Sequence, residues 1–371
     1  MRIGIDARML GPIVGGGGLG RYVEELVNGL AQLGHKHRLV LFLKNERQAS
    51  VITKRCLNVQ LRIADTHWYT FKEQLVLSRI IDREKLDLVH FPHWNVPLFI
   101  KTPFVVTIHD LILLEEPKSA KITTRSPIVF ALKHLAYKIV LRHVLKRSRI
   151  IVAVSNHTKA SILKHFPWVP AEKIRVIYEG IVGLSSDGNV AHKTEKSLLY
   201  VGNAYPHKNL EKLLEAFKIL VDSDPTFTLT LAGREDIFYE RIKTNVRSSG
   251  LKNRVRFVMN PSDEELHDLY CNATLFVFPS RNEGFGLPPL EAMSIGLPVV
   301  SSRAASLPEI LGDAALYFDP TDAEEIAKKI QLGITDKNLR EELKLKGFER
   351  IKNFSWAKMA EEILKIYEHA C

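Results

Sequence analysis

Short runs of β-branched and aliphatic residues alternate with segments of helical periodicity along all 371 residues. In one such segment the apolar residues at 210, 213, 214, 217 and 220 fall on a single helical face. This alternation predicts parallel sheets covered by helices on both sides. The predicted strands are 2–6, 38–43, 58–63, 87–91, 103–108, 150–154 and 174–178, followed by 197–201, 227–232, 254–259, 274–278, 298–301 and 315–318.

A polar, glycine-containing segment at 183–196 interrupts the alternation once and has the composition of a linker. The chain is also long enough to build two hydrophobic cores. We therefore predict an α/β fold of two doubly wound, Rossmann-like domains, 1–183 and 184–354, that face a cleft. A last helix is expected within 355–371.

Composition narrows the class of protein further. Hydrophobic residues make up 46% of the chain, and no apolar run approaches the roughly 20 residues of a membrane-spanning helix. The charged segment Arg2–Arg8 predicts a strand rather than a signal peptide. Cys56, Cys271 and Cys371 lie far apart without metal-ligand spacing, which favours a reducing compartment. We expect a cytoplasmic protein.

Positive charge is concentrated in the first half of the chain. Residues 1–183 contain 28 Lys and Arg against 14 Asp and Glu, whereas the remainder contains 24 against 28. Residues 117–171 carry no acidic side chain at all. Within them, 128–147 has apolar residues at helical spacing with basic residues in between. This predicts either a helix that docks on an anionic membrane surface or one packed on its own sheet with a solvated basic face.

The most informative motif runs from Phe278 to Ala292, where a buried strand is followed by a glycine turn and a helix beginning with two prolines. Open α/β sheets bind ligands at the carboxyl ends of their strands. The N–H groups near Gly286 and Leu287 at the helix start would attract phosphate. Glu283 precedes the helix and Glu291 lies within it, so one carboxylate can face a reacting group while the other reaches ribose hydroxyls. The plainer alternative is an ordinary strand–turn–helix junction.

A second glycine-rich segment, 15–20, satisfies G-x-G-x-x-G between a strand and a helix. A nicotinamide dinucleotide is disfavoured, because the glycines come about eight residues after the strand and the next strand ends in Lys44 instead of an acidic residue. We interpret Gly17 and Gly18 as part of a backbone cradle for a diphosphate. A surface loop is the alternative.

Two further strand ends carry candidate residues. Asn203 and Lys208 follow the strand at 197–201, and the lysine at the predicted helix start could neutralise a diphosphate. His109 ends the strand at 103–108, where a ligand-facing role competes with a purely structural one. The single D-x-D motif, Asp222-Ser-Asp224, precedes a proline and is typical of a turn, so no metal site is predicted.

Together these segments resemble the family 4 retaining glycosyltransferases, which have the GT-B fold. The resemblance rests on the Glu-x7-Glu pair of 283 and 291, the loop 15–20, and the segments 107–110, 206–209 and 354–356. It implies transfer of a hexose, with retention, from a nucleotide diphosphate sugar to a saccharide or lipid-linked acceptor, with no cofactor and no metal. It also implies that the last helix packs back on the first domain.

The same resemblance implies roles for individual residues. Glu283 and His109 would position the sugar, Glu291 would hold the ribose, and Lys208 would stabilise the leaving diphosphate. Asn203 stands where many members of the family have an arginine. The Pro206-His-Lys-Asn209 form is similar to that of bacterial mannosyltransferases, which favours GDP-mannose over a UDP-sugar.

Other functions remain open on the sequence alone. A sugar-nucleotide epimerase or a phosphorylase can share the GT-B fold. A nicotinamide-dependent oxidoreductase is disfavoured by the missing acidic residue. A polyanion-binding protein would account for the basic half, but no aromatic stacking motif accompanies it, so no nucleic-acid partner is expected.

Overall fold

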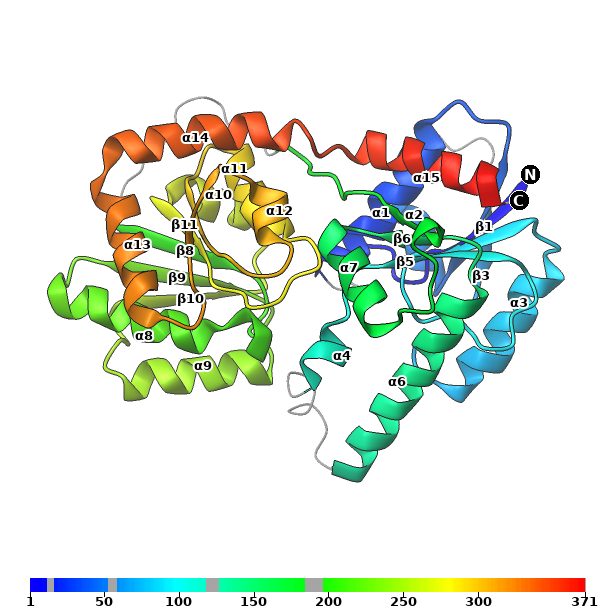
Figure 1. Ribbon diagram of the computed structural model, residues 1–371, viewed down its shortest axis with the longest axis horizontal. Helices are drawn as coiled ribbons and strands as arrows, with labels where there is room; N and C mark the ends of the chain where they lie inside the picture. The colour runs from blue at the N-terminus through cyan, green and yellow to red at the C-terminus, as the bar shows by residue number, and fades with distance from the viewer. Residues whose placement is uncertain (12–16, 53–58, 118–126, 184–195, 371) are drawn as a thin grey trace. The chain divides into compact units, whose positions relative to one another are not determined.

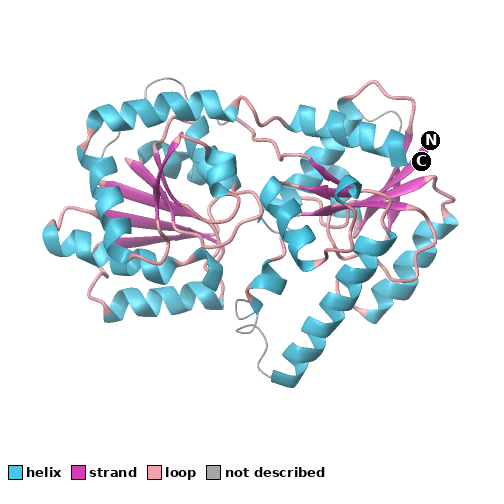
Figure 2. Ribbon diagram, viewed as in Figure 1, coloured by secondary structure: helices cyan, strands magenta, loops and turns pink. Residues whose placement is uncertain are grey.

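The computed structural model describes residues 1–11, 17–52, 59–117, 127–183 and 196–370. The described residues of 1–180 and 355–370 form one compact unit, and those of 181–354 form a second. Residues 184–195 of the predicted linker at 183–196, the loop residues Gly15 and Gly16, and residues 118–126 of the acid-free stretch lie outside the described residues. In both units helices flank a sheet of parallel strands (Figure 2).

The sheet of the first unit has seven parallel strands. Their order is β3 (Val59–Ile63), β2 (Arg38–Leu43), β1 (Arg2–Asp6), β4 (Leu88–Phe91), β5 (Phe104–Ile108), β6 (Ile151–Ala153) and β7 (Ile174–Val176). The chain first builds outward from β1 and then returns to add β4 on its other side. The order therefore reverses between β1 and β4, which leaves an opening at their carboxyl ends.

Helices cover this sheet (Figure 1), so its central strands are mostly buried. Every residue of β4 and β5 is buried, as expected for a parallel sheet covered on both faces. The helical segments are α1 (Gly17–Gln32), α2 (Glu46–Val51), a π-helical turn (Glu73–Leu77) that continues into α3 (Ser78–Arg83), α4 (Ile112–Glu115), α6 (Pro127–Arg147), α7 (Asn156–His165) and the 3-10 turn Ala171–Lys173.

The last helix, α15 (Trp356–Ala370), packs on α1 within the first unit. A side chain at Gly29 of α1 would bring its Cβ within 2.6 Å of the Ala360 Cβ, so glycine permits this close approach. Tyr367 of α15 also meets the buried His90 of β4, with 2.7 Å between the hydroxyl and Nδ1. The helix is thus joined to the first-unit sheet by both apolar and polar contacts.

The second unit repeats the plan with six parallel strands in the order β10 (Val255–Met259), β9 (Thr228–Gly233), β8 (Ser197–Val201), β11 (Leu275–Phe278), β12 (Val299–Ser302) and β13 (Ala315–Phe318). The reversal falls between β8 and β11. The accompanying segments are the 3-10 turn Pro206–Lys208, α8 (Leu210–Ser223), α9 (Ile237–Ser248), α10 (Asp263–Asn272), α11 (Leu287–Ser294), α12 (Leu307–Leu311), α13 (Ala323–Thr335) and α14 (Lys337–Ile351).

The predicted fold class is confirmed, and each predicted strand matches an observed one within two residues at either end. The predicted apolar face at 210–220 is buried in α8. One local expectation was wrong. Lys208 does not open the helix but ends a 3-10 turn, and Asn209 adopts a left-handed φ of 64° before α8 begins at Leu210. Among the described residues no helix has the length and apolarity to cross a membrane.

Candidate functional site

The reversal point of the second-unit sheet brings Lys208 and Glu283 into contact. Lys208 follows β8 and Glu283 follows β11, and these strands are neighbours although the residues are 75 positions apart. The Lys208 ammonium donates to Glu283 Oε1 at 2.5 Å. The Glu283 residue is only 7% exposed, so the pair is largely screened from water and each charge depends on the other.

Backbone contacts fix the two loops that carry this pair. Arg281 N donates to the His207 carbonyl at 2.7 Å, and the Ser280 hydroxyl donates to the same oxygen. The Asn209 amide donates to the carbonyl of Pro279 at 3.1 Å. The residues on either side of Lys208 are therefore hydrogen-bonded to the loop that leads to Glu283, which holds the ion pair in one geometry.

The helix α11 starts immediately after this loop. Gly286 is its N-cap with a φ of 102°, a conformation that glycine adopts without strain. Pro288 and Pro289 have no N–H, so Leu287 is the one residue among the first three of the helix that has a backbone N–H. The motif thus offers the backbone N–H groups of Gly286 and Leu287 as hydrogen-bond donors, in the segment that follows Glu283.

Glu291, eight residues beyond Glu283, is half-buried in α11 and accepts a hydrogen bond from the Tyr270 hydroxyl at 2.8 Å. Tyr270 is fully buried on α10, so it anchors the carboxylate from the protein side. Asn203, which stands where the resemblance would place an arginine, makes hydrogen bonds within its own loop. Its side-chain oxygen accepts from Tyr205 N at 3.3 Å, and its carbonyl accepts from the Tyr200 hydroxyl; in the described residues Asn203 thus orders its own loop.

In the first unit, His109 follows β5 and pairs with Glu179, which follows β7. The imidazole Nδ1 lies 2.9 Å from Glu179 Oε1, and Nε2 lies 2.9 Å from the Pro92 carbonyl oxygen. Both neighbours accept hydrogen bonds only, so the ring satisfies both contacts when each nitrogen carries a proton. This geometry indicates a cationic histidine between a carboxylate and a carbonyl.

The electrostatics agree with that protonation state. Burial acts to lower the pKa of His109, but the hydrogen bond and charge of Glu179, together with the Pro92 carbonyl, raise the pKa above its usual value. Tyr22 of α1 packs edge-on against the ring, with 4.7 Å between centroids. Sequence reasoning missed Glu179. Its position just after β7, at the same sheet edge as His109, was the signal that could have found it.

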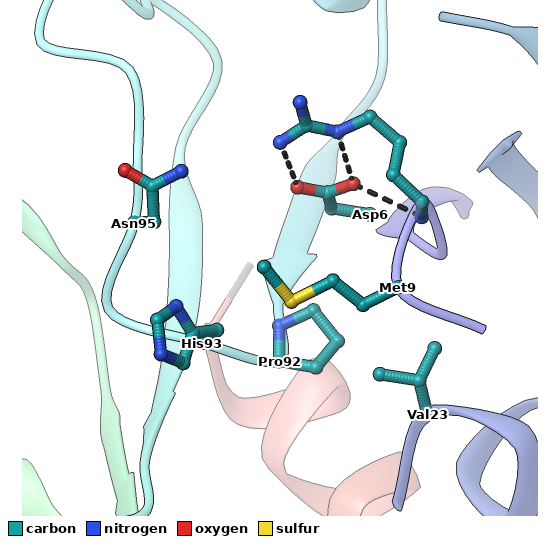
Figure 3. Close-up of a pocket in the computed structure, with 7 residues that line it drawn as sticks. Asp6, Met9, Val23, Pro92, His93 and Asn95 are labelled. Carbon is teal, nitrogen blue, oxygen red and sulfur yellow. Dashed lines mark hydrogen bonds and ion pairs between the residues drawn. The ribbon is translucent and has the colours of Figure 1, made fainter. Parts of the chain in front are cut away.

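A small polar pocket lies at the reversal point of the first-unit sheet (Figure 3). Its volume of about 10 Å³ suits roughly one water molecule. Asp6 at the end of β1 makes two side-chain hydrogen bonds with Arg8, both at 2.8 Å. His93, after β4, has a buried Nδ1 without a hydrogen-bond partner among the described residues, and burial lowers the pKa of His93 to about 3. The pocket is lined by Asp6, Arg8, Met9, Val23, Pro92, His93 and Asn95.

The described part of the glycine-rich loop forms the start of α1. Gly17, with a φ of 54°, and Gly18 are exposed first residues of α1. A Cβ at Gly20 would come within 2.4 Å of the Gly11 carbonyl oxygen, so glycine lets the segment after β1 lie against the helix start. The two exposed glycines are available to a ligand, and their proposed contact with a diphosphate remains a prediction.

No cluster of three or more His, Cys, Asp or Glu that could hold a metal is found in the part of the chain that the structure describes. The Asp222-Ser-Asp224 motif lies at the end of α8, where Asp222 pairs with Lys218 and Asp224 pairs with Lys196. Both carboxylates are thus engaged with lysines. Metal independence itself remains a prediction for experiment.

Comparison with known proteins defines the class. Residues 16–182 match the family described as Glycosyltransferase Family 4, and residues 185–350 match the one described as Glycosyl transferases group 1. The chain belongs to these glycosyltransferases. It is 31% identical over 261 residues to O-antigen chain mannosyltransferase RfbU of Salmonella typhimurium, an alignment that covers 70% of this chain and 69% of the relative.

A second relative is O-antigen chain mannosyltransferase B of Escherichia coli, at 32% identity over 246 residues and 62% of each chain. The match therefore spans less than two thirds of that relative. Sucrose-phosphate synthase from Thermosynechococcus elongatus has the same fold, with a TM-score of 0.78, 22% identity and coverage of 100% and 98%. Anabaena HepE, solved in complex with UDP-glucose, gives a TM-score of 0.75 at 17% identity, with 99% of each chain covered.

Proposed function

We propose that the protein transfers a hexose from a nucleotide diphosphate sugar to a hydroxyl of a saccharide or lipid-linked acceptor, with retention at the anomeric carbon and without a metal. In the net reaction the acceptor oxygen bonds to the anomeric carbon while the bond from that carbon to the diphosphate oxygen breaks. The nucleoside diphosphate leaves, and the acceptor hydroxyl gives up its proton. The observation that carries this proposal is the Lys208–Glu283 pair at the reversal point of the second-unit sheet.

The residues after β8 and β11 would act on the donor. Lys208, with the N–H groups of Gly286 and Leu287, would stabilise the charge that grows on the departing diphosphate. Before the donor binds, Glu283 would hold the Lys208 ammonium in place. When the donor binds, its diphosphate would compete with Glu283 for the lysine. The Glu283 carboxylate would then face the sugar as positive charge develops on its ring. Glu291, held by Tyr270, would bind the ribose hydroxyls.

The first unit would supply the acceptor side. The polar pocket at the ends of β1 and β4 offers Asp6, His93 and Asn95 to an acceptor hydroxyl. We assign His109 a positioning role beside the sugar and Gly17 and Gly18 a backbone contact with the diphosphate. Because both ring nitrogens of His109 already donate to Glu179 and Pro92, the ring would act as a fixed positive charge and not as a proton acceptor.

We favour GDP-mannose as the donor, in cytoplasmic glycan or polysaccharide synthesis. The two relatives named as O-antigen mannosyltransferases support the choice, and the HepE complex with UDP-glucose keeps a UDP-sugar as the alternative. Thermal-shift measurements with GDP, UDP, GDP-mannose and UDP-glucose would separate them, because a ligand stabilises in proportion to its occupancy of the folded state. Stabilisation by GDP and GDP-mannose but not by UDP and UDP-glucose is expected; stabilisation by UDP and UDP-glucose alone would reverse the assignment.

A transfer assay then tests the reaction class. With radiolabelled GDP-mannose and a mannose-containing acceptor, we expect a new glycoside whose anomeric coupling constant matches the α configuration of the donor. A β-linked product would exclude retention. Donor that is isomerised without transfer would identify an epimerase, and release of sugar phosphate from a glycoside by inorganic phosphate would identify a phosphorylase.

A further inference from the structure

The first half of α6 carries an apolar stripe that faces solvent. Ile128, Leu132, Leu135 and Ile139 are spaced four, three and four positions apart, which places them on one side of the helix. Their exposed fractions lie between 52% and 73%. This end of α6 projects away from the sheet (Figure 1). A contiguous apolar row on an exposed helix marks an interaction site.

Packing within the first unit does not use this stripe. The side of α6 that meets the core is formed by the buried residues Tyr137, Leu141, Val144 and Leu145. The helix is therefore apolar on two opposite sides, and only one of them is covered. The second half of the helix thus packs on its own unit, as one of the two sequence-based alternatives for 128–147 predicted, while the outer side of the first half stays exposed.

Basic residues lie near the stripe. Lys138 lies beside it and Lys146 continues its line along the helix, whereas Lys133 lies farther round the helix, towards the side that carries Val144. Each of these three lysines is exposed, and none of them is paired with a carboxylate among the described residues. The acid-free character of 117–171 keeps this region positive. Aliphatic side chains bordered by unpaired lysines are the pattern of a helix that lies in a lipid interface.

A second basic surface adjoins the end of α6. Arg147 Nη2 lies 3.5 Å from the Ile100 carbonyl oxygen, so the last turn of α6 touches the loop that carries Phe99 and Lys101. Beside that loop is an open groove of about 420 Å³. The groove is lined by Leu75, Ser78, Arg79, Asp82, Arg83, Phe99 and Lys101.

The groove is net positive because its three cationic side chains, Arg79, Arg83 and Lys101, outnumber its one carboxylate. Asp82 accepts hydrogen bonds from Lys101 N, Thr102 N and the Thr102 hydroxyl. The side chains of Arg79, Arg83 and Lys101 are exposed, and no carboxylate pairs with any of them among the described residues. Phe99 is 61% exposed at the same groove. Cations and apolar side chains thus occur together here, as they do on α6.

We propose that α6 and this groove form a docking surface for an anionic phospholipid bilayer. The apolar stripe would enter the boundary between headgroups and acyl chains, while Lys133, Lys138, Lys146 and the groove cations would meet lipid phosphates. An unbroken aliphatic row fits the acyl region of a bilayer, whereas a nucleic acid would be met by stacking aromatic residues. The proposal goes beyond sugar transfer and stands independently of it.

Vesicle co-sedimentation of the full chain tests the proposal. Vesicles of phosphatidylcholine alone are compared with vesicles that also contain phosphatidylglycerol, at low and high salt. We expect binding to the anionic vesicles only, weakened at least tenfold by high salt, because salt screens exposed charges. Absence of binding, or equal binding to the neutral vesicles, would overturn the proposal.

Matched variants separate this surface from general basicity. Lys133→Gln, Lys138→Gln and Lys146→Gln are combined in one variant, and Lys252→Gln, Lys328→Gln and Lys337→Gln, three exposed lysines of the second unit, form the control. We expect the α6 variant to bind anionic vesicles at least tenfold more weakly and the control to bind as the parent does. Equal weakening by both sets would mean unspecific charge attraction and would overturn the proposal.

Two more variants probe the other components. Leu132→Ser with Ile139→Ser should weaken vesicle binding at both salt concentrations, since it removes apolar and not charged contacts; its control is Ile219→Ser with Ile237→Ser in the second unit. Arg79→Gln with Arg83→Gln should weaken binding at low salt. All substituted residues are exposed, so unchanged thermal midpoints confirm folding. Full vesicle binding by both the Leu132→Ser/Ile139→Ser variant and the Arg79→Gln/Arg83→Gln variant would contradict the proposal. Binding of acidic proteins by a chain that does not bind vesicles would contradict it as well.

Discussion

Each sheet presents an ion pair at its carboxyl edge, but the two pairs differ in chemistry. In the second unit, Lys208 and Glu283 come from neighbouring strands on either side of the order reversal. In the first, His109 and Glu179 come from β5 and β7, with β6 between them. Histidine is the side chain whose charge changes near neutral pH, and pairing with Glu179 raises the pKa of His109. The charge of the His109–Glu179 pair therefore depends on pH.

The largest effect is expected from the Lys208–Glu283 pair. Glu283→Gln keeps the side-chain shape but removes the charge that orients Lys208 and faces the sugar. A lost hydrogen bond to a charged group costs about 1.5–3 kcal/mol, which corresponds to a roughly 10–150-fold lower kcat. Donor KM should change little, because the role lies in the reacting step. Steady-state kinetics measure both.

Lys208→Ala should lose activity as well, and Lys212→Ala, which alters a partly exposed lysine on α8 paired with Glu215, is its control. Normal kinetics in both Glu283→Gln and Lys208→Ala would remove this pair from the site. If only Lys212→Ala were impaired, the assignment of the site to the reversal point would be wrong.

The pH-dependent pair should give the next largest effect. Glu179→Gln removes the carboxylate that raises the pKa of His109, so the ring should lose its proton at a lower pH. We expect a kcat reduced by about tenfold, as for a loss of about 1.4 kcal/mol, with the fall in activity on the alkaline side moved to lower pH. The pH–rate profile and the His109 titration by NMR check this.

Glu172→Gln, in the exposed 3-10 turn before β7, serves as the control for Glu179→Gln. An unchanged His109 titration would show that Glu179 does not set the charge of the ring. A changed titration with unchanged activity would keep the pair but remove its role in transfer.

Glu291→Ala tests donor binding at the second-unit sheet. Because the carboxylate would contact the ribose equally in the ground and transition states, its loss should raise donor KM by about tenfold or more, with kcat little changed. Tyr270→Phe removes only the partner that holds the carboxylate and should have a smaller effect in the same direction. An effect confined to acceptor KM would contradict the ribose assignment.

Buried His90 provides a stability test with a sign opposite to that of His109. Burial, with a smaller contribution from His109, lowers the pKa of His90 to about 3. The unfolded chain therefore binds a proton that the folded chain refuses between about pH 6.5 and 3, and stability falls by about 1.4 kcal/mol per pH unit through this window as the solution is acidified. His109, with its raised pKa, instead contributes stability below about pH 6.5 that is lost on alkalinisation.

Thermal midpoints between pH 7 and 4 measure the His90 effect. In His90→Gln the midpoint should fall less steeply with acid than in the parent chain, although the variant starts lower because the hydrogen bonds to Tyr367 and Thr107 are altered. Parallel pH curves for the two proteins would show that His90 is not a source of acid sensitivity.

The smallest effect is expected from removal of metal ions. Lys208 and the start of α11 would meet the diphosphate without a metal ion, so treatment with EDTA should leave kcat and donor KM unchanged. Loss of turnover that magnesium or manganese restores would show that this description of the phosphate site is incomplete.

The sequence by itself determined the elements and the local backbone around the candidate residues of the second unit. Parallel strands covered on both faces have mainly apolar centres, so β1, β2, β8 and β13 could be located with their observed bounds. The glycines and prolines at 284–289 restrict the local backbone, which is why the loop and helix around Glu283 and Glu291 were predictable. Lys208 was also named as a candidate from a local motif, but the motif did not predict that Lys208 lies in a 3-10 turn.

Only the tertiary structure decided which distant residues meet. The strand orders place β8 beside β11 and bring β7 to the same edge as β5, and this order is not written in local periodicity. For that reason the partner of Lys208 and the pairing of His109 with Glu179 could not be derived from spacing. The same holds for α6, whose two apolar sides look equivalent in sequence until packing buries one of them. Periodicity encodes what neighbours along the chain require, whereas charge pairing and exposure depend on which elements lie against each other in space.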